Sequence, residues 1–243
     1  MKLSDFKVLT FDCYGTLIDW ESGILRALRP LADRAGGALD GEAILAAFAS
    51  IESARQAATP DLPYAALLAT VHTCLADVWA VPGDAVESER FGASIGDWPP
   101  FPDTIEALAA LKRRYKLVIL SNVDRLSFHA TNQRLGVTFD AIYTAQDIGS
   151  YKPDPRNFTY LIDRLAEDGF HKSDILHVAQ SLYHDHAPAN AAGLASAWID
   201  RRHGAAGRGG AGWGATPPPP RGARYDYCFK SLAELAAAVE AGD

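Results

Sequence analysis

The chain has 243 residues, of which 48% are hydrophobic and 22% are charged, and its formal net charge is −7 at pH 7. This length and composition allow one sizeable α/β core with an inserted subdomain, and they exclude disordered and fibrous proteins. The negative charge argues against non-specific nucleic-acid binding, because neutralising phosphates requires a basic face. We therefore expect no nucleic-acid partner.

The cysteine usage and the N-terminus indicate a cellular compartment. Cys13, Cys74 and Cys228 are an odd, widely spaced set without a Cys-x-x-Cys pair, which is typical of a reduced protein. Charged residues interrupt the first ten positions, and no apolar stretch approaches ~18 residues, so neither a signal peptide nor a membrane span is expected. These features predict a cytoplasmic protein with no membrane partner.

Short apolar runs that read as strands recur along the chain. Because helical segments separate them in the second half, they predict an α/β fold with a Rossmann-like, doubly wound parallel sheet. A further edge strand is expected at 225–229 and a covering helix at 232–239. The predicted strands are 7–11, 117–120, 141–143, 175–178 and 195–199.

About a hundred residues between the first two runs are rich in Ala and Leu at helical spacing. Three apolar stripes in this region predict amphipathic helices that pack into a bundle. We predict a helical cap at 17–99, inserted after the first strand of a catalytic core formed by 1–16 and 100–243. The stripes are Leu25, Leu28 and Leu31; Ile44, Leu45 and Phe48; and Leu67, Leu68, Val71 and Leu75.

A segment near the C-terminus has a different composition. Residues 203–222 are rich in Gly and end in Pro217 to Pro220, and their only large apolar side chain is Trp213. Such a composition predicts a disordered or surface loop, with a recognition loop as the alternative.

The first candidate functional residue follows the first strand. Asp12 stands at the strand's carboxyl end, and Gly15 allows the sharp bend that exposes it. A carboxylate in this place is a candidate nucleophile, and an Asx-turn is the alternative explanation of an isolated aspartate. Tyr14 occupies the position two residues on, where a second carboxylate would be expected.

Three later segments place further polar residues at strand ends. Ser121 and Asn122 follow the second run, and Lys152 lies in the turn 149–155. The fourth run leads into the sequence Gln-Ser-Leu-Tyr-His-Asp-His at 180–186, which contains Asp185. Because carboxyl ends of parallel strands share one edge of a sheet, these side chains are expected near Asp12.

The four segments, in this order, resemble the four motifs of the haloacid dehalogenase-like hydrolase superfamily. The stretch Phe-Asp-Cys-Tyr-Gly-Thr-Leu at 11–17 most resembles the 2-haloacid dehalogenases, whereas the superfamily's phosphatases carry Asp-x-Asp. The resemblance implies that Asp12 displaces halide from C2 of a small, anionic 2-haloalkanoate and forms an aspartyl ester. Water then hydrolyses the ester and yields a 2-hydroxy acid.

The same resemblance assigns roles to other residues. Thr16 and Lys152 would orient and charge the nucleophile, and Lys152 within ~4 to 6 Å of Asp12 would lower its pKa. Ser121 would bind the substrate carboxylate, with Asn122 near the departing halide and Tyr14 at the substrate. A cap arginine would complete the halide cradle. Arg55 is the candidate for that position, and its competitors are Arg26, Arg29 and Arg34.

Two departures from the dehalogenase pattern affect the hydrolytic half of the reaction. The family's Ser-x-Asn-x-x-Asp stretch corresponds to 180–185, where only Asp185 is retained, and the family's tyrosine aligns with Phe158. Histidines flank Asp185, and a neutral imidazole can accept a proton from water. We expect Asp185, helped by His184, to activate the water, whereas His186 is expected to flank the next helix.

Two other functions remain open. A phosphatase on the same fold would use Mg²⁺ held by Asp12 and Asp185, whereas the dehalogenase reaction requires no cofactor or metal. A binding or regulatory protein on the same fold is the second alternative, although it has no chemical need for this set of residues. A phosphonatase would need a cap lysine, and none lies between Lys7 and Lys112. Homodimers are common among the proteins the chain resembles, so a second copy is a candidate partner.

Overall fold

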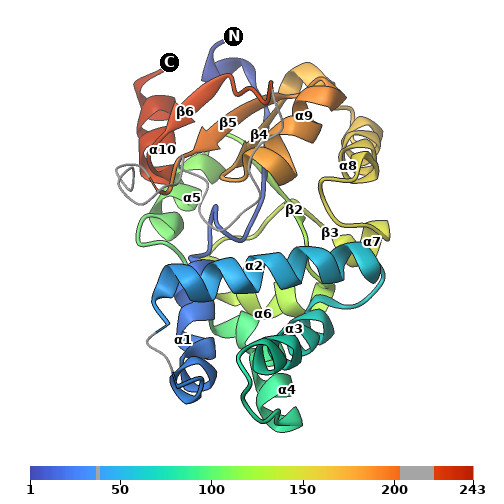
Figure 1. Ribbon diagram of the computed structural model, residues 1–243. Coiled ribbons are helices and arrows are strands. Elements are labelled where there is room, and N and C mark those ends of the chain that lie inside the picture. Colours follow the sequence, from blue (N-terminus) through green and yellow to red (C-terminus); the bar gives the residue numbers. More distant parts are fainter. Residues whose placement is uncertain (37–38, 203–221, 243) are drawn as a thin grey trace.

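The computed structural model describes residues 1–36, 39–202 and 222–242. Its centre is a parallel sheet with the strand order β3-β2-β1-β4-β5-β6 (Figure 1). The order runs outward from β1 in both directions, which confirms the predicted doubly wound, Rossmann-like α/β sheet. The strands are β1 (Val8–Phe11), β2 (Lys116–Ser121), β3 (Ala141–Thr144), β4 (Ile175–Ala179), β5 (Ala195–Ile199) and β6 (Tyr227–Phe229).

The central strands are apolar runs because helices cover both faces of the sheet. All residues of β1 and β4 are buried. Two separate hydrophobic clusters lie against the sheet, one that includes Leu108 and Leu235 and another that includes Phe158 and Leu161. The helices that carry them are α5 (Thr104–Lys112) with α10 (Leu232–Ala241), and α8 (Pro155–Glu167) with α9 (Ala187–Ala192).

Shorter elements complete this part of the chain. The helix α6 (Arg125–Leu135) follows β2, and α7 (Ala145–Ile148) follows β3. The sequence correctly predicted β6 at the edge of the sheet and α10 after it. Three single turns are η1 (Leu3–Asp5), η3 (Lys172–Asp174) and the π-helical turn η4 (Leu182–His186).

Four longer helices stand between β1 and α5. Asp19, Asp40 and Asp84 accept hydrogen bonds from backbone N–H groups at the starts of α1, α2 and α4, which fixes where these helices begin. All three predicted apolar stripes lie in these helices, and only Leu25 among them is not fully buried. The helices are α1 (Trp20–Arg34), α2 (Gly41–Ala58), α3 (Tyr64–Val78) and α4 (Ala85–Ala93), followed by η2 (Ser94–Asp97).

In Figure 1, α2 crosses the molecule between the sheet and the helices α1, α3 and α4. It therefore forms the face of the inserted helices that is turned toward the ends of the strands. The division of the chain at residues 17 and 99 stays a prediction.

The predicted Gly/Pro-rich loop at 203–222, with Trp213, lies almost wholly outside the described residues. Immediately before it, Arg201 donates hydrogen bonds to the backbone oxygen of Thr16 and to Asp103, with which it forms an ion pair at 2.7 Å. These contacts hold the chain at Arg201 next to the turn that follows β1.

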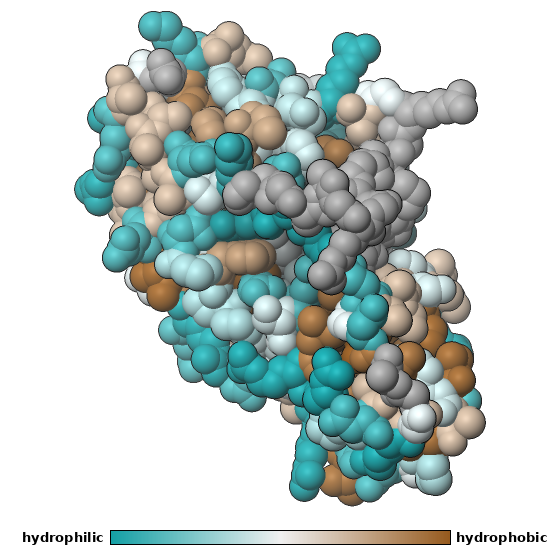
Figure 2. All heavy atoms as spheres, turned by 60° about the vertical axis from the view of Figure 1, so that its left-hand side comes forward, coloured by the Kyte–Doolittle hydropathy of each residue, from teal (hydrophilic) through white to brown (hydrophobic). Residues whose placement is uncertain are grey.

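On the face in Figure 2, hydrophobic atoms form scattered patches rather than one continuous area. The large hydrophobic side chains that are exposed lie on different elements; examples are Val78 on α3, Leu126 on α6 and Ile142 on β3. They do not indicate a dimer interface, and homodimerisation stays a prediction. No helix among the described residues is long and apolar enough to cross a membrane.

Candidate active site

The turn after β1 fixes the orientation of Asp12. Gly15 has a φ of +95°, and a Cβ atom at this position would lie 2.9 Å from Nε1 of Trp20, so only glycine fits without displacing the indole. The Thr16 hydroxyl donates to Oδ2 of Asp12 at 2.8 Å and accepts from the backbone N–H of Gln180 at 2.9 Å. Thr16 thus ties the Asp12 carboxylate to the chain that follows β4.

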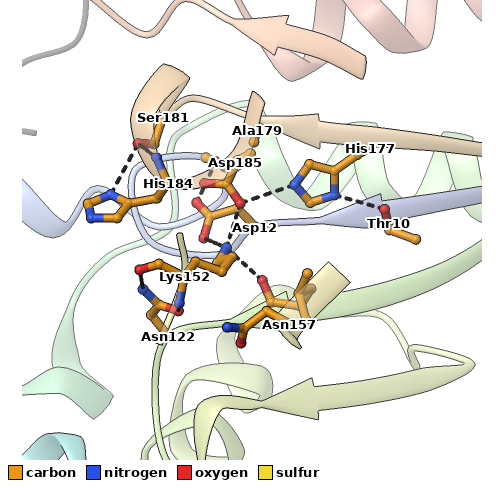
Figure 3. Close-up of polar contacts among 12 residues, drawn as sticks. Thr10, Asp12, Asn122, Lys152, Asn157, His177, Ala179, Ser181, His184 and Asp185 are labelled. Carbon is orange, nitrogen blue, oxygen red and sulfur yellow. Dashed lines mark hydrogen bonds and ion pairs between the residues drawn. The ribbon is translucent and has the colours of Figure 1, made fainter. Parts of the chain in front are cut away.

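Lys152 lies between two carboxylates (Figure 3). Its Nζ donates to Oδ1 of Asp12 at 2.9 Å, to Oδ1 of Asp185 at 2.6 Å and to the backbone oxygen of Leu120 at 2.9 Å. These bonds use all three ammonium hydrogens. The Asn122 side chain forms two hydrogen bonds with the backbone of Lys152. Its oxygen accepts from the N–H at 2.7 Å, and its nitrogen donates to the carbonyl oxygen at 3.0 Å. The buried lysine is therefore held in one position.

Asp185 belongs to η4, a single π-helical turn of the type often found at functional sites. Its Oδ1 also accepts from Nε2 of His177 at 3.1 Å, and Nδ1 of His177 accepts from the Thr10 hydroxyl at 2.8 Å. Thr10 and His177 are register partners on β1 and β4, which places them side by side. Oδ2 of Asp185 is buried and has no hydrogen-bond partner among the described residues.

The two carboxylates titrate as a coupled pair around one ammonium. Burial raises the pKa of Asp12; the Lys152 charge lowers it, as predicted, but does not outweigh burial, so the net shift is upward. Burial also disfavours ionised Asp185, but Lys152 and His177 outweigh it and hold the Asp185 pKa well below its usual value. The pKa of Lys152 is raised, because the two carboxylates outweigh its burial. Asp185 is therefore the stronger acid of the pair.

A cavity of about 80 Å³ opens between these residues and α2. The strand-end side is lined by Asp12, Tyr14, Asn122, Lys152, Ser181, His184 and Asp185, and the side of the inserted helices by Trp20, Phe48, Ala49, Glu52, Ser53, Gln56 and Tyr64.

The structure brings most predicted site residues together. Asp12, Tyr14, Asn122, Lys152, His184 and Asp185 line the cavity, and Thr16 contacts Asp12. Ser121 ends β2, and its buried Oγ has no hydrogen-bond partner among the described residues. The Tyr14 hydroxyl shares a 2.8 Å hydrogen bond with Thr131, and burial raises the pKa of Tyr14 well above its usual value. Tyr14 is therefore a neutral hydroxyl.

The histidines differ in position. The Ser181 hydroxyl accepts from the backbone N–H of His184 and shares a hydrogen bond of 3.2 Å with Nδ1 of the same residue. Burial lowers the pKa of His184 to about 4, so the ring is neutral near pH 7. His186 is fully buried and bonds to Ser196 and to the carbonyl of Ala179, away from the cavity.

Arg55 is not among the described residues that line the cavity, and its place in a halide cradle stays a prediction. Successive residues of an α-helix are rotated by about 100°, and α2 turns Glu52 and Gln56 toward the cavity instead. Arg55 is exposed on the side of α2 that faces α3, where Nη2 donates to Sγ of Cys74 at 3.2 Å. Among the described residues, the competing arginines are also absent from the cavity wall.

Sequence reasoning missed several residues of the site, among them His177, Glu52 and Gln56. His177 lies inside an apolar strand. A polar side chain within such a buried run could have indicated a functional residue. Glu52 and Gln56 continue the apolar stripe that ends at Phe48, at intervals of four residues. Extending that stripe would have identified them. Phe158, at the family's tyrosine position, packs edge-to-face on His177 with ring centroids 5.0 Å apart.

A metal centre would need several His, Cys, Asp or Glu side chains close together. Within the part of the chain that the structure describes, no group of three or more His, Cys, Asp and Glu side chains could hold a metal ion. The two carboxylates of the pair converge on Lys152. The Mg²⁺ site of the phosphatase alternative thus has only these two carboxylates as protein ligands, and the absence of a cofactor stays a prediction.

Comparison with known proteins places this geometry in context. Residues 6–193 match the family model described as haloacid dehalogenase-like hydrolase. The (S)-2-haloacid dehalogenase of Pseudomonas putida is 32% identical over 109 residues, which is 44% of this chain and 46% of that protein. The (S)-2-haloacid dehalogenase 4A of Burkholderia cepacia is 26% identical over 181 residues, 68% of this chain and 71% of that protein. The match to the Pseudomonas relative thus spans less than half of its length.

A solved structure shares the fold over nearly the whole chain. The L-2-haloacid dehalogenase of Xanthobacter autotrophicus, with chloropropionic acid covalently bound, superposes with a TM-score of 0.79 at 20% identity. The match covers 97% of this chain and 98% of that one. At this level of identity the similarity concerns the fold.

Proposed function

Because the chain belongs to the haloacid dehalogenase-like hydrolase family, we propose that it hydrolyses the carbon–halogen bond of a small 2-haloalkanoate. The observation that carries the proposal is Tyr14. A phosphate ester leaves as an alkoxide that needs a proton, and the neutral Tyr14 hydroxyl, with its raised pKa, is a poor donor of one. Halide leaves without a proton, so this site suits a halide leaving group.

The first step is a displacement at carbon. A carboxylate oxygen of ionised Asp12 attacks C2, the bond from C2 to the halogen breaks, and halide departs with the bonding electrons. Lys152 and Thr16 hold the carboxylate through Oδ1 and Oδ2, which fixes its direction of attack. Asn122 can donate its second amide hydrogen toward the halide, because the first is bonded to the carbonyl of Lys152. The product is an ester of Asp12, and the relative with covalently bound chloropropionic acid supports such an intermediate.

The second step hydrolyses that ester. Water attacks the carboxyl carbon of Asp12 and gives up a proton, and the bond from that carbon to the alkoxide oxygen breaks. The free Oδ2 of Asp185 accepts that proton. One of the two protons of the water ends on the departing alkoxide and completes the 2-hydroxy acid, and the other passes to solvent as both aspartates return to their ionised form. The neutral ring of His184 lines the same cavity, and its proposed help is to orient the water or to accept a proton from it.

Halide release tests the proposal. Fluoro-, chloro- and bromoacetate and both enantiomers of 2-chloropropionate are incubated with the protein and EDTA, beside Asp12→Asn. We expect halide from at least one substrate, no requirement for metal, and loss of release in the variant. Because C2 is attacked once, the product should have inverted configuration, and retention would contradict the mechanism. Mg²⁺-dependent hydrolysis of a phosphate ester without halide release would favour the phosphatase instead.

A further inference from the structure

The inserted helices contribute a carboxyl group that the reaction above does not use. Glu52 lies on α2 and lines the same cavity as Asp12. Its Oε1 accepts from the Tyr64 hydroxyl at 3.0 Å and from Nε2 of Gln56 at 2.6 Å. Its Oε2 has no partner among the described residues. One oxygen is thus saturated by donors, and the other is available to a ligand in the cavity.

No positive charge balances Glu52. Lys152 is the only Lys or Arg among the described residues that line the cavity, and its three hydrogens are bonded to Asp12, Asp185 and Leu120. With both aspartates ionised, these three side chains carry a net charge of −1. Ionised Glu52 would bring the cavity to −2, which opposes the entry of an anion.

The protonated form of Glu52 removes this conflict. Two donors on Oε1 direct the acidic hydrogen to Oε2, where it can form a hydrogen bond with a bound anion. We propose that Glu52 is a substrate-binding residue that acts as a neutral carboxylic acid and donates from Oε2 to the anionic 2-haloalkanoate. This inference rests on the proposed function, and it gives the inserted helices a substrate contact where a cation was expected.

The proposal predicts a pH dependence of substrate binding. Burial raises the pKa of Glu52 to about 7, with the Tyr64 hydrogen bond acting against it. The neighbouring His184 has a pKa of about 4 and does not change charge near neutrality. Below pH 7 Glu52 is neutral and binds the anion; above it, the carboxylate repels the anion. The titratable and charged groups that face the cavity with Glu52 are Tyr64 on α3, Asp12 and Tyr14 after β1, Lys152 before α8, and His184 and Asp185 in η4. Tyr151, outside the cavity wall, also interacts electrostatically with Glu52.

Two measurements between pH 6 and 9 test it. The first is KM for (S)-2-chloropropionate, and the second is the Kd of propionate, which has no halogen to lose, by calorimetry. Each constant should be level below about pH 7 and then rise toward tenfold per pH unit. In Glu52→Gln the amide keeps an acceptor for Tyr64 and a donor for the anion, so both constants should stay low up to pH 9. Glu89→Gln removes an equal charge from the exposed face of α4, and it should keep the parent profile.

The outcomes separate the two proposals. A level Kd for propionate across this pH range in the parent protein, or an unchanged rise in Glu52→Gln, would overturn the role of Glu52. Binding of propylammonium in preference to propionate would also overturn it, since the ionised form would then be the recognition state. If propionate binding follows the expected profile but no halide is released, the dehalogenase function fails and the role of Glu52 stands. The parent profile is measured without any variant, so poor folding of Glu52→Gln leaves the test intact.

Discussion

The two sides of the cavity use ionisable groups in opposite ways. At the strand ends, Asp12 and Asp185 share the Lys152 cation, which fixes the position of both carboxylates. On α2, Glu52 is bonded through one oxygen to neutral donors, and none of the described residues in the cavity wall forms an ion pair with it. A carboxylate in contact with a cation is held in one position for attack. An acid that has a pKa near 7 and no counter-ion can instead change its protonation state when a charged ligand enters the cavity. The strand ends are thus suited to chemistry, and α2 is suited to recognition.

Removing the shared cation should have the largest effect. In Lys152→Met, two buried carboxylates face each other without compensation, which raises their pKa values and leaves Asp12 protonated for much of the time. We expect halide release to fall at least about 10³-fold, because the nucleophile loses both charge and position. The free energy of unfolding at pH 7 should fall by about 3–5 kcal/mol.

The pH dependence of the loss in unfolding free energy tests whether uncompensated charge is its cause. In the variant, the folded-state pKa values of the carboxylates lie above their unfolded values, so protonation stabilises the folded variant. Its deficit relative to the parent should therefore shrink as the pH falls from 7 toward 4. Chemical denaturation at several pH values measures this, and a deficit that is constant with pH would mean that Lys152 acts through packing alone.

Asp185→Asn should separate the two chemical steps. The amide is a poor acceptor for the proton of water, so ester hydrolysis slows while displacement of halide continues. We expect a burst of about one halide per site, and turnover at least about 10²-fold slower. The intact protein should gain the mass of the carboxyalkyl group of the substrate, which is the substrate without its halogen. Normal turnover by this variant would remove Asp185 from the mechanism.

His177 links the sheet to this pair, and its replacement should have a smaller effect. His177→Phe removes the donor to Oδ1 of Asp185 and leaves the Thr10 hydroxyl without its partner. Loss of a stabilising donor raises the pKa of Asp185, so the acidic limb of the kcat profile should move to higher pH. We expect kcat to fall about tenfold and the free energy of unfolding to fall by about 1–3 kcal/mol. An unchanged pH profile would limit His177 to a packing role.

Much of the strand-end side could be predicted from the sequence, because parallel strands end at one edge of the sheet. Each polar residue after an apolar run, such as Asp12 or Asn122, is brought there by topology alone. His177 was missed because it lies within a strand and acts through its cross-strand partner, which the sequence does not reveal. The net direction of the Asp12 pKa shift was missed because it depends on burial, and the extent of burial follows from packing of the whole fold.

The α2 side could not be predicted in the same way, because its contribution depends on helix rotation. Arg55 and Gln56 are neighbours in sequence but differ by about 100° around the helix. The apolar stripe through Phe48 gives the buried face but does not say which part of it meets the cavity and which part meets α3. Only the packing of α2 on α3 decides that Gln56 faces the substrate and Arg55 faces Cys74.

Arg55→Gln should therefore have the smallest effect, and it tests the comparison most directly. Arg55 is exposed, and its contact with Cys74 involves a sulfur acceptor on the side of α2 that faces α3. We expect KM for (S)-2-chloropropionate to change less than about twofold, since exposed contacts contribute little. A tenfold rise in KM with unchanged kcat would mean that α2 rotates to bring a cation to the substrate. In that case the inserted helices would bind the anion through a positive charge, and a neutral Glu52 would not be needed for binding.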